Sequence, residues 1–282
     1  MDIYGVAILA VLGLFSGLLA GVMGLGGGVV LVPLIQALGY SPVQAVATSS
    51  LAILMTSVSA SIHNYRMGNL DFKRVILLGL PSLFTAQLGV FLSSEIPDYI
   101  LLGTFSIFLV INIFLSQFRN KLAAEDLGKK VEQKVNNKLI DRIAQFSPEI
   151  AKLIQGGFKD FLARIFTGGL TGFLAGFYGI GGGVIMVPLQ MILLSESIII
   201  AIQTSLGVIM VTSISACLGH GLRGNILLLE GLILGLGGLI GAQISSRFLP
   251  RLPSKVIAIA FNSLLALLSI YVMYLAYNSY SL

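Results

Sequence analysis

Long apolar stretches separated by short polar intervals cover most of the chain. No Asp, Glu, Lys or Arg occurs between Ile3 and Tyr65, or between Val256 and Leu282. A helix that spans a bilayer needs roughly 20 apolar residues, so stretches of this length predict several membrane-spanning helices. The pattern predicts an all-α polytopic membrane protein and excludes a soluble fold.

Ten apolar segments can be placed, five in each half of the chain. They cover roughly residues 3–22, 27–39, 43–64, 73–94 and 99–117, and then 165–178, 182–194, 198–218, 226–247 and 255–277. The second segment of each half, of about 13 residues, is too short to span as a straight helix. The first two segments of each half are therefore expected to form a hairpin or a broken pair. Whether the short segments span or re-enter stays open.

The two halves are repeats of each other. The stretch Gly21-Val-Met-Gly-Leu-Gly-Gly-Gly-Val-Val-Leu-Val-Pro-Leu34 returns as Gly176-Phe-Tyr-Gly-Ile-Gly-Gly-Gly-Val-Ile-Met-Val-Pro-Leu189, with nine of the fourteen positions identical. With one residue inserted, the match continues through the rest of both halves. It pairs Thr48-Ser49 with Thr204-Ser205, Ser57-x-Ser59-Ala60 with Ser213-x-Ser215-Ala216, Gly68-Asn69 with Gly224-Asn225, and Ala86-Gln87 with Ala242-Gln243.

Charged residues predict how the repeats are oriented. Arg66, Lys73 and Arg74 lie in one loop of the first half, and residues 118–164 hold ten Lys or Arg against six acidic residues. The positive-inside rule places both regions in the cytoplasm. In the second half the basic loop is the one after residue 247, so the loop at Gly224 is expected outside. The halves are therefore expected to be inverted, with both chain termini outside.

This orientation gives three predicted regions. Residues 1–117 form the first membrane repeat, 118–164 a cytoplasmic loop, and 165–282 the second membrane repeat. Within the loop, Ser147-Pro148-Glu149 is typical of a helix start, and apolar residues from Ile150 to Leu162 follow near helical spacing. We expect an amphipathic helix on the cytoplasmic membrane surface.

Glycines fall into two groups with different expected roles. Gly13, Gly17 and Gly21 recur every four residues, as do Gly168, Gly172 and Gly176; this small-xxx-small spacing favours close helix packing. The triplets Gly26-Gly27-Gly28 and Gly181-Gly182-Gly183 disfavour a continuous helix. A short helix follows each triplet, and its unpaired N–H groups and positive dipole end could bind an anion. A tight turn without a ligand is the alternative.

Polar residues inside the apolar segments are further candidates for substrate contacts. Thr48, Ser49, Thr204 and Ser205 could donate to an anion or bond to their own helix backbone. Gln87 and Gln243 lie well inside segments, where an amide needs a partner. That partner is either another helix, through a hydrogen bond, or the ligand. His63 and His220 lie near segment ends, do not align in the repeat, and are interpreted as interfacial.

Composition narrows the class of function. Hydrophobic residues make up 56% of the 282 residues and charged residues only 10%, against about 25% charged in soluble domains. The net charge of +5 comes from loops, so it indicates membrane orientation and no nucleic acid. No carboxylate is centred in a segment, as a cation pump would usually need, and there is one cysteine, Cys217. We see no nucleophile–base pair, metal cluster or cofactor motif, and therefore expect no enzyme and no cofactor.

These motifs resemble those of the sulfite exporter TauE/SafE family of membrane permeases. The resemblance rests on Gly24-Leu-Gly-Gly-Gly-Val-Val-Leu-Val-Pro33 and Gly179-Ile-Gly-Gly-Gly-Val-Ile-Met-Val-Pro188, with Ala47-Thr48-Ser49 and Thr204-Ser205 after them. It covers both membrane halves and implies transport of small sulfur-containing anions across the plasma membrane. One departure is Gln203, which stands where the first half has Ala47 and could make the two half-sites unequal.

The sequence thus predicts a secondary transporter in a lipid bilayer that exports sulfite or an organosulfonate by alternating access around a midplane site. A passive anion channel is the alternative. The expected substrate contacts are Gly26, Gly27, Gly28, Thr48, Ser49, Gln87, Gly181, Gly182, Gly183, Thr204, Ser205 and Gln243. We expect the negative charge of the substrate to be met without a fixed cation, because every Lys or Arg of the ten segments lies at a segment end. The coupling ion, direction and oligomeric state are left open.

Overall fold

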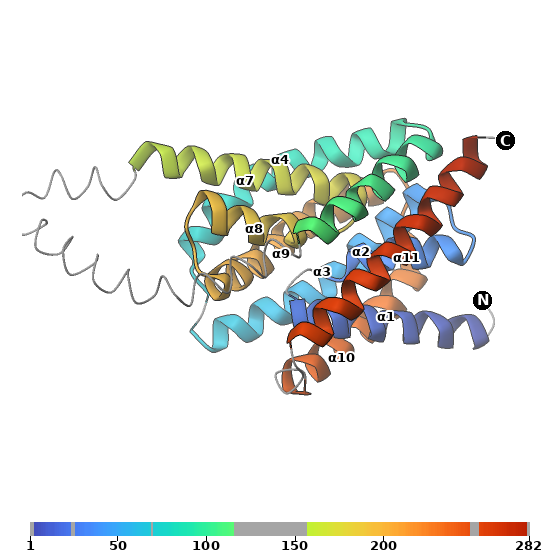
Figure 1. Cartoon of the computed structure of the whole chain (residues 1–282), viewed down its shortest axis with the longest axis horizontal. Helices are drawn as coiled ribbons and strands as arrows, with labels where there is room; N and C mark the ends of the chain where they lie inside the picture. The colour runs from blue at the N-terminus through green and yellow to red at the C-terminus, as the bar shows by residue number, and fades with distance from the viewer. Residues whose placement is uncertain (1–2, 24–25, 69, 116–156, 249–253, 281–282) are drawn as a thin grey trace, which may run out of the picture.

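The computed structural model describes residues 3–23, 26–68, 70–115, 157–248 and 254–280. These residues form helices joined by short loops, with no strand among them (Figure 1). The helices are α1 (Ile3–Met23), α2 (Gly28–Ala37), α3 (Pro42–Arg66), α4 (Phe72–Glu95), a helix over Asp98–Leu115, α7 (Gly157–Tyr178), α8 (Gly183–Leu193), α9 (Ile198–Leu222), α10 (Leu228–Phe248) and α11 (Ser254–Tyr280). All ten predicted segments are helical, and the all-α prediction is confirmed.

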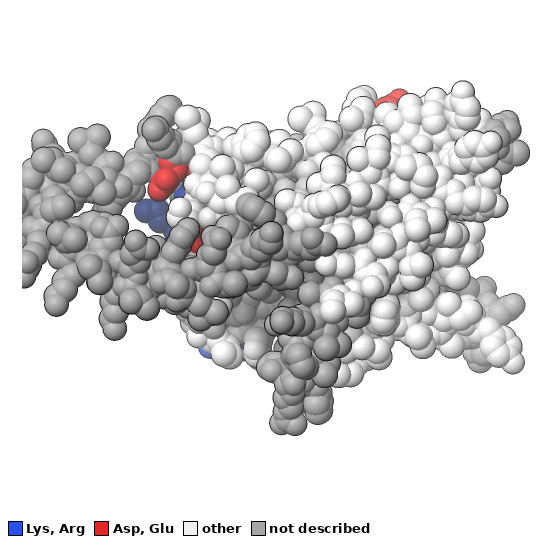
Figure 2. All heavy atoms as spheres, viewed as in Figure 1, with Lys and Arg blue, Asp and Glu red and all other residues white. Residues whose placement is uncertain are grey.

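Six stretches within the described residues are long and apolar enough to cross a membrane. They are Pro42–Arg66, Phe72–Glu95, Asp98–Leu115, Asp160–Tyr178, Ile199–Leu222 and Asn262–Tyr280. Many of their large apolar side chains point outward, including Phe84 and Leu88 on α4. Figure 2 shows a broad uncharged face, with the visible charged side chains toward the ends of the helices. The protein is therefore a multi-pass membrane protein.

Local sequence explains where the principal helices begin. Ser41 accepts from the Gln44 amide, and the Gln44 side chain accepts from the Ser41 amide, which makes a capping box at the start of α3. Asp71 caps α4 by accepting from the amides of Lys73 and Arg74. The short helices α2 and α8 have 10 and 11 residues. At 1.5 Å per residue each is about 15 Å long, roughly half the hydrocarbon thickness.

Helices of each half pack against helices of the other half. Helix α1, the first of its half, packs along α10, the fourth of the other half, and α7 packs along α4 in the same way (Figure 1). Helices α3 and α9, the third of each half, contact each other. The start of α1 and the end of α11 lie at the same end of the bundle (Figure 1). A twofold relation between the halves would give this arrangement; their inverted orientation in the membrane stays a prediction.

The spaced glycines permit these close contacts. A Cβ on Gly13 or Gly17 would overlap backbone atoms of α10, at Leu234 and Gly238 respectively. On the other pair, a Cβ on Gly168, Gly172 or Gly176 would overlap backbone atoms of α4, at Leu78, Ser82 and Ala86 respectively. The packing interpretation is thus confirmed for these five glycines, while Gly21 lies outside the residues whose surroundings are described.

Helix α7 begins earlier than the sequence suggested. It starts at Gly157 rather than near residue 165, so the last part of the predicted surface helix is continuous with a membrane helix. Arg164 in this part donates to Glu196 at 3.1 Å, and Arg74 of α4 lies 3.5 Å from the same oxygen. Glu196 is in the loop between α8 and α9, so it ties three elements together. The remainder of the predicted surface helix and of the loop lies outside the described residues.

Candidate substrate site

The two glycine breaks meet at the centre of the protein. A Cβ on Gly28 would overlap the carbonyl oxygen of Gly179 and the Cα of Ile180, so the backbone of one break touches that of the other. Gly26 and Gly181 both face the Cγ2 methyls of Ile53 and Ile209, which are themselves equivalent positions in the repeat. Both isoleucines are buried. The space expected to hold an anion between the breaks is therefore filled by apolar side chains in this conformation.

The backbone at each break adopts a conformation that favours glycine. Gly27 and Gly182 precede α2 and α8 with φ of 74° and 78°, the left-handed region in which a side chain would be strained. The Gly27 carbonyl accepts from Ser16 Oγ at 3.0 Å. Among the described residues, no acceptor faces the amides of Gly183 and Val184. These are the orphan donors of a helix start, so the chemistry for binding an anion is present there.

The predicted hydroxyls are buried, and three of the four already have protein partners. Ser49 Oγ donates to the carbonyl of Gly179 at 2.8 Å, tying α3 to the second break. Thr48 Oγ1 accepts from the Leu227 amide at 3.2 Å. Ser205 Oγ donates to the Ile202 carbonyl of its own helix, and Thr204 is buried nearby. Their role toward an anion stays a prediction.

The two glutamines, although equivalent in the repeat, have different environments. Gln87 Nε2 donates to the carbonyl and to the Oγ of Ser215, at 2.6 and 2.9 Å. This is the hydrogen bond between helices that the sequence left open as one interpretation. Gln243 lines a cavity and has a polar or electrostatic partner of its own. The two equivalent glutamines therefore border different surroundings, a neighbouring helix for Gln87 and a cavity for Gln243.

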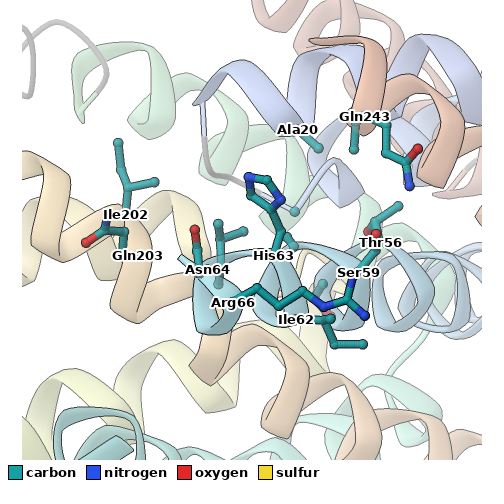
Figure 3. A pocket seen from close by; sticks show the side chains of 15 residues that line it. Ala20, Thr56, Ser59, Ile62, His63, Asn64, Arg66, Ile202, Gln203 and Gln243 are labelled. Atoms are coloured by element: carbon teal, nitrogen blue, oxygen red, sulfur yellow. The ribbon is translucent and has the colours of Figure 1, made fainter. Parts of the chain in front are cut away.

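The cavity has a volume of about 480 Å³ and lies among α1, α3, α9 and α10 (Figure 3). It extends between the buried Gly26 at the first break and the exposed Arg66 at the end of α3. Two of the predicted substrate contacts, Gly26 and Gln243, line this cavity. Its other polar lining residues are Thr56, Ser57, Ser59, His63, Asn64, Arg66 and Gln203.

The lining mixes polar and apolar side chains, has no carboxylate and has one fixed positive charge. Arg66 supplies the charge at the exposed end of the cavity, outside the predicted segment 43–64, so an anion site at the breaks without a fixed cation stays a prediction. The Asn64 Nδ2 is buried and has no partner among the described residues. Hydroxyl and amide donors together with a guanidinium are suited to a small oxyanion, which accepts hydrogen bonds.

Sequence reasoning missed most of this lining. The serines of the Ser57-x-Ser59-Ala60 element are predicted only as part of the repeat. A usable signal was the spacing of Thr56, Ser59 and His63, which places these three residues on one face of a helix. Gln203 was recognised as a departure from Ala47, and it does make the halves unequal: Gln203 lines the cavity, whereas Ala47 is fully buried. His63 is predicted to be interfacial and Arg66 to lie in a cytoplasmic loop, because nothing in the sequence shows that the end of α3 borders a cavity.

Comparison with known proteins gives one family for nearly the whole chain. The sequence model of the family described as Sulfite exporter TauE/SafE matches residues 9–272. No solved structure matches. The family match therefore covers both glycine breaks, the cavity and the repeat.

Curated relatives of this chain are described as membrane transporters. A Bacillus subtilis protein described as "Probable membrane transporter protein YunE" is 26% identical over 95% of this chain and 97% of its own length. "Probable membrane transporter protein MJ0441" of Methanocaldococcus jannaschii is 25% identical over 76% of this chain and 71% of its own length. Another Bacillus subtilis protein, "Probable membrane transporter protein YdhB", is 23% identical over 86% of this chain and 89% of its own length. The chain belongs to the sulfite exporter TauE/SafE family of membrane transporters.

Proposed function

We propose that this protein is a secondary transporter that exports a small sulfur oxyanion, such as sulfite or an organosulfonate, by alternating access. The observation that carries the proposal is the cavity between Arg66 and Gly26. It provides hydroxyl and amide donors, a guanidinium and no carboxylate. A cation would find no counter-charge along this lining, whereas an anion would find hydrogen-bond donors on α3, α9 and α10.

The size of the cavity suits a small, partly hydrated anion. A water molecule takes about 30 Å³ of liquid volume, so about 480 Å³ holds a tetrahedral or pyramidal oxyanion with several waters. Such an ion could pass the cavity while hydrated and exchange its waters for protein donors at the break. The amides that start α2 and α8 are the donors proposed for that exchange.

Alternating access fits a pathway that is open at the Arg66 end and packed shut at the breaks. Under the charge-based orientation, the Arg66 end of α3 faces the cytoplasm, so the cavity is an inward-facing entrance. Inverted-repeat transporters place their substrate site where the repeats meet and open it to one side at a time. The two breaks meet in this way, with Ile53 and Ile209 packed at the junction.

A passive anion channel is the second candidate. It is favoured by the absence, among the described residues, of any carboxylate in the cavity that could carry a coupling proton or cation. A channel of this kind should give unitary anion currents in a planar bilayer, whereas a transporter should give none.

Binding of candidate substrates to the purified protein tests the proposed substrate class. Sulfite, thiosulfate and sulfoacetate should each bind with saturable heat in calorimetry, while potassium and ammonium, supplied as chloride salts, should not. The expected contacts make Thr204→Ala a useful variant: loss of one hydrogen bond to a charged group would weaken binding about tenfold or more. Saturable cation binding with no anion binding would overturn the proposal.

A further inference from the structure

We propose that a second cavity, closed in this conformation, lies among α3, α4, α7 and α9, and that Gln87 and Ser215 hold it shut. The inference rests on the proposed function, since a transporter must open its site to the other side at some stage. It adds the position of the second half of the pathway and the contacts that close it.

The repeat identifies the residues of this second cavity. Ser57 and Asn64 of the open cavity correspond to Ser213 and His220 on α9, and Gln243 corresponds to Gln87. The correspondence gives the opposite half polar side chains at these three positions, whereas His63, Arg66 and Gln203 have the equivalents Gly219, Leu222 and Ala47. In the open half these residues line space, as Figure 3 shows for Asn64 and Gln243.

In the opposite half, two of the corresponding polar atoms on α9 are buried without partners in the described part of the chain, although the other ring nitrogen of His220, Nε2, lies 3.4 Å from the Gly176 carbonyl oxygen. Ser213 is 2% exposed and His220 fully buried. Ser213 Oγ and His220 Nδ1 have no hydrogen-bond partner among the described residues. An unpaired polar group in the interior is costly. Two of them at repeat positions that line a cavity on the other side indicate a polar pathway that is dry only while it is closed.

A row of contacts between α4 and α9 closes this half. Gln87 Nε2 donates twice to Ser215, whose Oγ in turn donates to the Leu83 carbonyl at 2.7 Å. Further along, the Arg223 guanidinium lies 5.7 Å from the centre of the Phe91 ring. Asn225 Nδ2 then donates to Ser94 Oγ at 3.4 Å. All of these pairs join the second half of α4 to the end of α9 and the loop after it, so separating the two helices breaks them together.

Cysteine labelling from either side of the membrane tests this arrangement without any substrate. Cys217→Ser gives a cysteine-free background, since Cys217 is the only cysteine. Ser57→Cys and Ser213→Cys then place equivalent thiols in the open and closed halves. Each is treated with a charged, membrane-impermeant methanethiosulfonate in right-side-out and inside-out vesicles. Ser57→Cys should react only from the face to which the Arg66 end of α3 belongs, and Ser213→Cys only from the opposite face, more slowly.

Release of the closing contacts should accelerate only the second reaction. Gln87→Met removes the amide donor at similar side-chain length, and the labelling rate of Ser213→Cys should rise at least severalfold. If Gln87→Met does not fold, Ser215→Ala is the alternative variant, and the same effect is expected of it. The matched control is Thr85→Val on the same helix, whose hydroxyl bonds only carbonyls of α4; it should leave the rate unchanged.

Two results would overturn the proposal. One is a Ser213→Cys thiol that stays unreactive from both sides in the Gln87→Met and Ser215→Ala backgrounds, while Ser57→Cys reacts. The other is reaction of Ser213→Cys from the same face as Ser57→Cys. Because no sulfur anion is used, failure of sulfite binding leaves this test intact, and opposite-sided labelling without sulfite binding would count against the substrate class alone.

Discussion

At the scale of single residues, the proposed anion preference of the cavity rests on a few side chains near the end of α3. Arg66 is exposed and fixed in charge, and it borders the cavity together with His63 and Asn64. A cation at the entrance raises the local concentration of anions, and this effect weakens as salt screens it. Under the proposed function, Arg66 is expected to act on the arrival of the substrate more than on its final coordination.

Arg66→Met should raise the KM for sulfite roughly threefold to tenfold at low ionic strength and by less at high ionic strength. The measurement is initial uptake into inside-out vesicles at two salt concentrations. Lys73→Met is the control, because Lys73 lies at the start of α4 at the same end of the bundle but does not line the cavity. An unchanged KM at low salt would remove Arg66 from the pathway.

Gln203 is a second residue whose effect can be isolated. Its equivalent, Ala47, shows that the fold accepts alanine at this repeat position. Gln203→Ala should therefore keep the fold and weaken sulfite binding about tenfold or more, the value of one hydrogen bond to a charged group. Gln203→Glu should weaken it further, since a carboxylate repels the anion. Calorimetry measures both, and wild-type affinity in Gln203→Glu would contradict an anion pathway here.

At the scale of helices, tight packing holds α1 to α10 and α7 to α4 as pairs. A methyl group on Gly17 would overlap the backbone of Gly238, so no side chain fits without separating the helices. Gly17→Leu should lower the melting temperature and the folded yield, with a destabilisation of about 1–3 kcal/mol or more.

The control for Gly17→Leu is Gly103→Ala in the Asp98–Leu115 helix. No atom lies within 4 Å of a Cβ at Gly103, so alanine should leave the melting temperature unchanged or raise it, as expected from helix propensity. Thermal unfolding in detergent compares the two variants. Equal melting temperatures for Gly17→Leu and wild type would remove the packing assignment.

Glu196 connects α4, α7 and α9 at one end of the bundle. Its side chain is 6% exposed, and that of its partner Arg164 is 18% exposed. Removing one member of a buried pair leaves the other uncompensated, at a cost of about 3 kcal/mol. Glu196→Gln should therefore lower the melting temperature by several degrees, whereas Glu95→Gln, at an exposed site near the end of α4, should not. A melting temperature equal to wild type in Glu196→Gln would contradict this role.

Most elements could be predicted from the sequence, because apolar length and glycine spacing act locally. The short helices, the breaks and the close contacts of Gly13, Gly17, Gly168 and Gly172 all follow from the pattern. The start of α7 could not be predicted. Residues 157–164 carry charges typical of a membrane surface, and only the tertiary contact between Arg164 and Glu196 accounts for a continuous helix there.

At the scale of the whole molecule, a nearly symmetric sequence adopts an asymmetric conformation. One half encloses a cavity beside Gln243, while in the other Gln87 is hydrogen-bonded to Ser215, the contact proposed to close it. The sequence could show which residues are equivalent and that the breaks matter. It could not show which half is open, because that depends on the conformation and not on the residue pattern. For the same reason the polar residues of α3 that line the cavity escaped prediction.

The proposed function is transport of a sulfur oxyanion by alternating access. Counterflow tests it most directly: proteoliposomes loaded with unlabelled sulfite are diluted into a trace of radiolabelled sulfite without any ion gradient. A transporter should accumulate label transiently above its equilibrium level, and chloride in place of the internal sulfite should abolish this overshoot. Monotonic equilibration of label with no overshoot, from vesicles that demonstrably contain folded protein, would contradict the account.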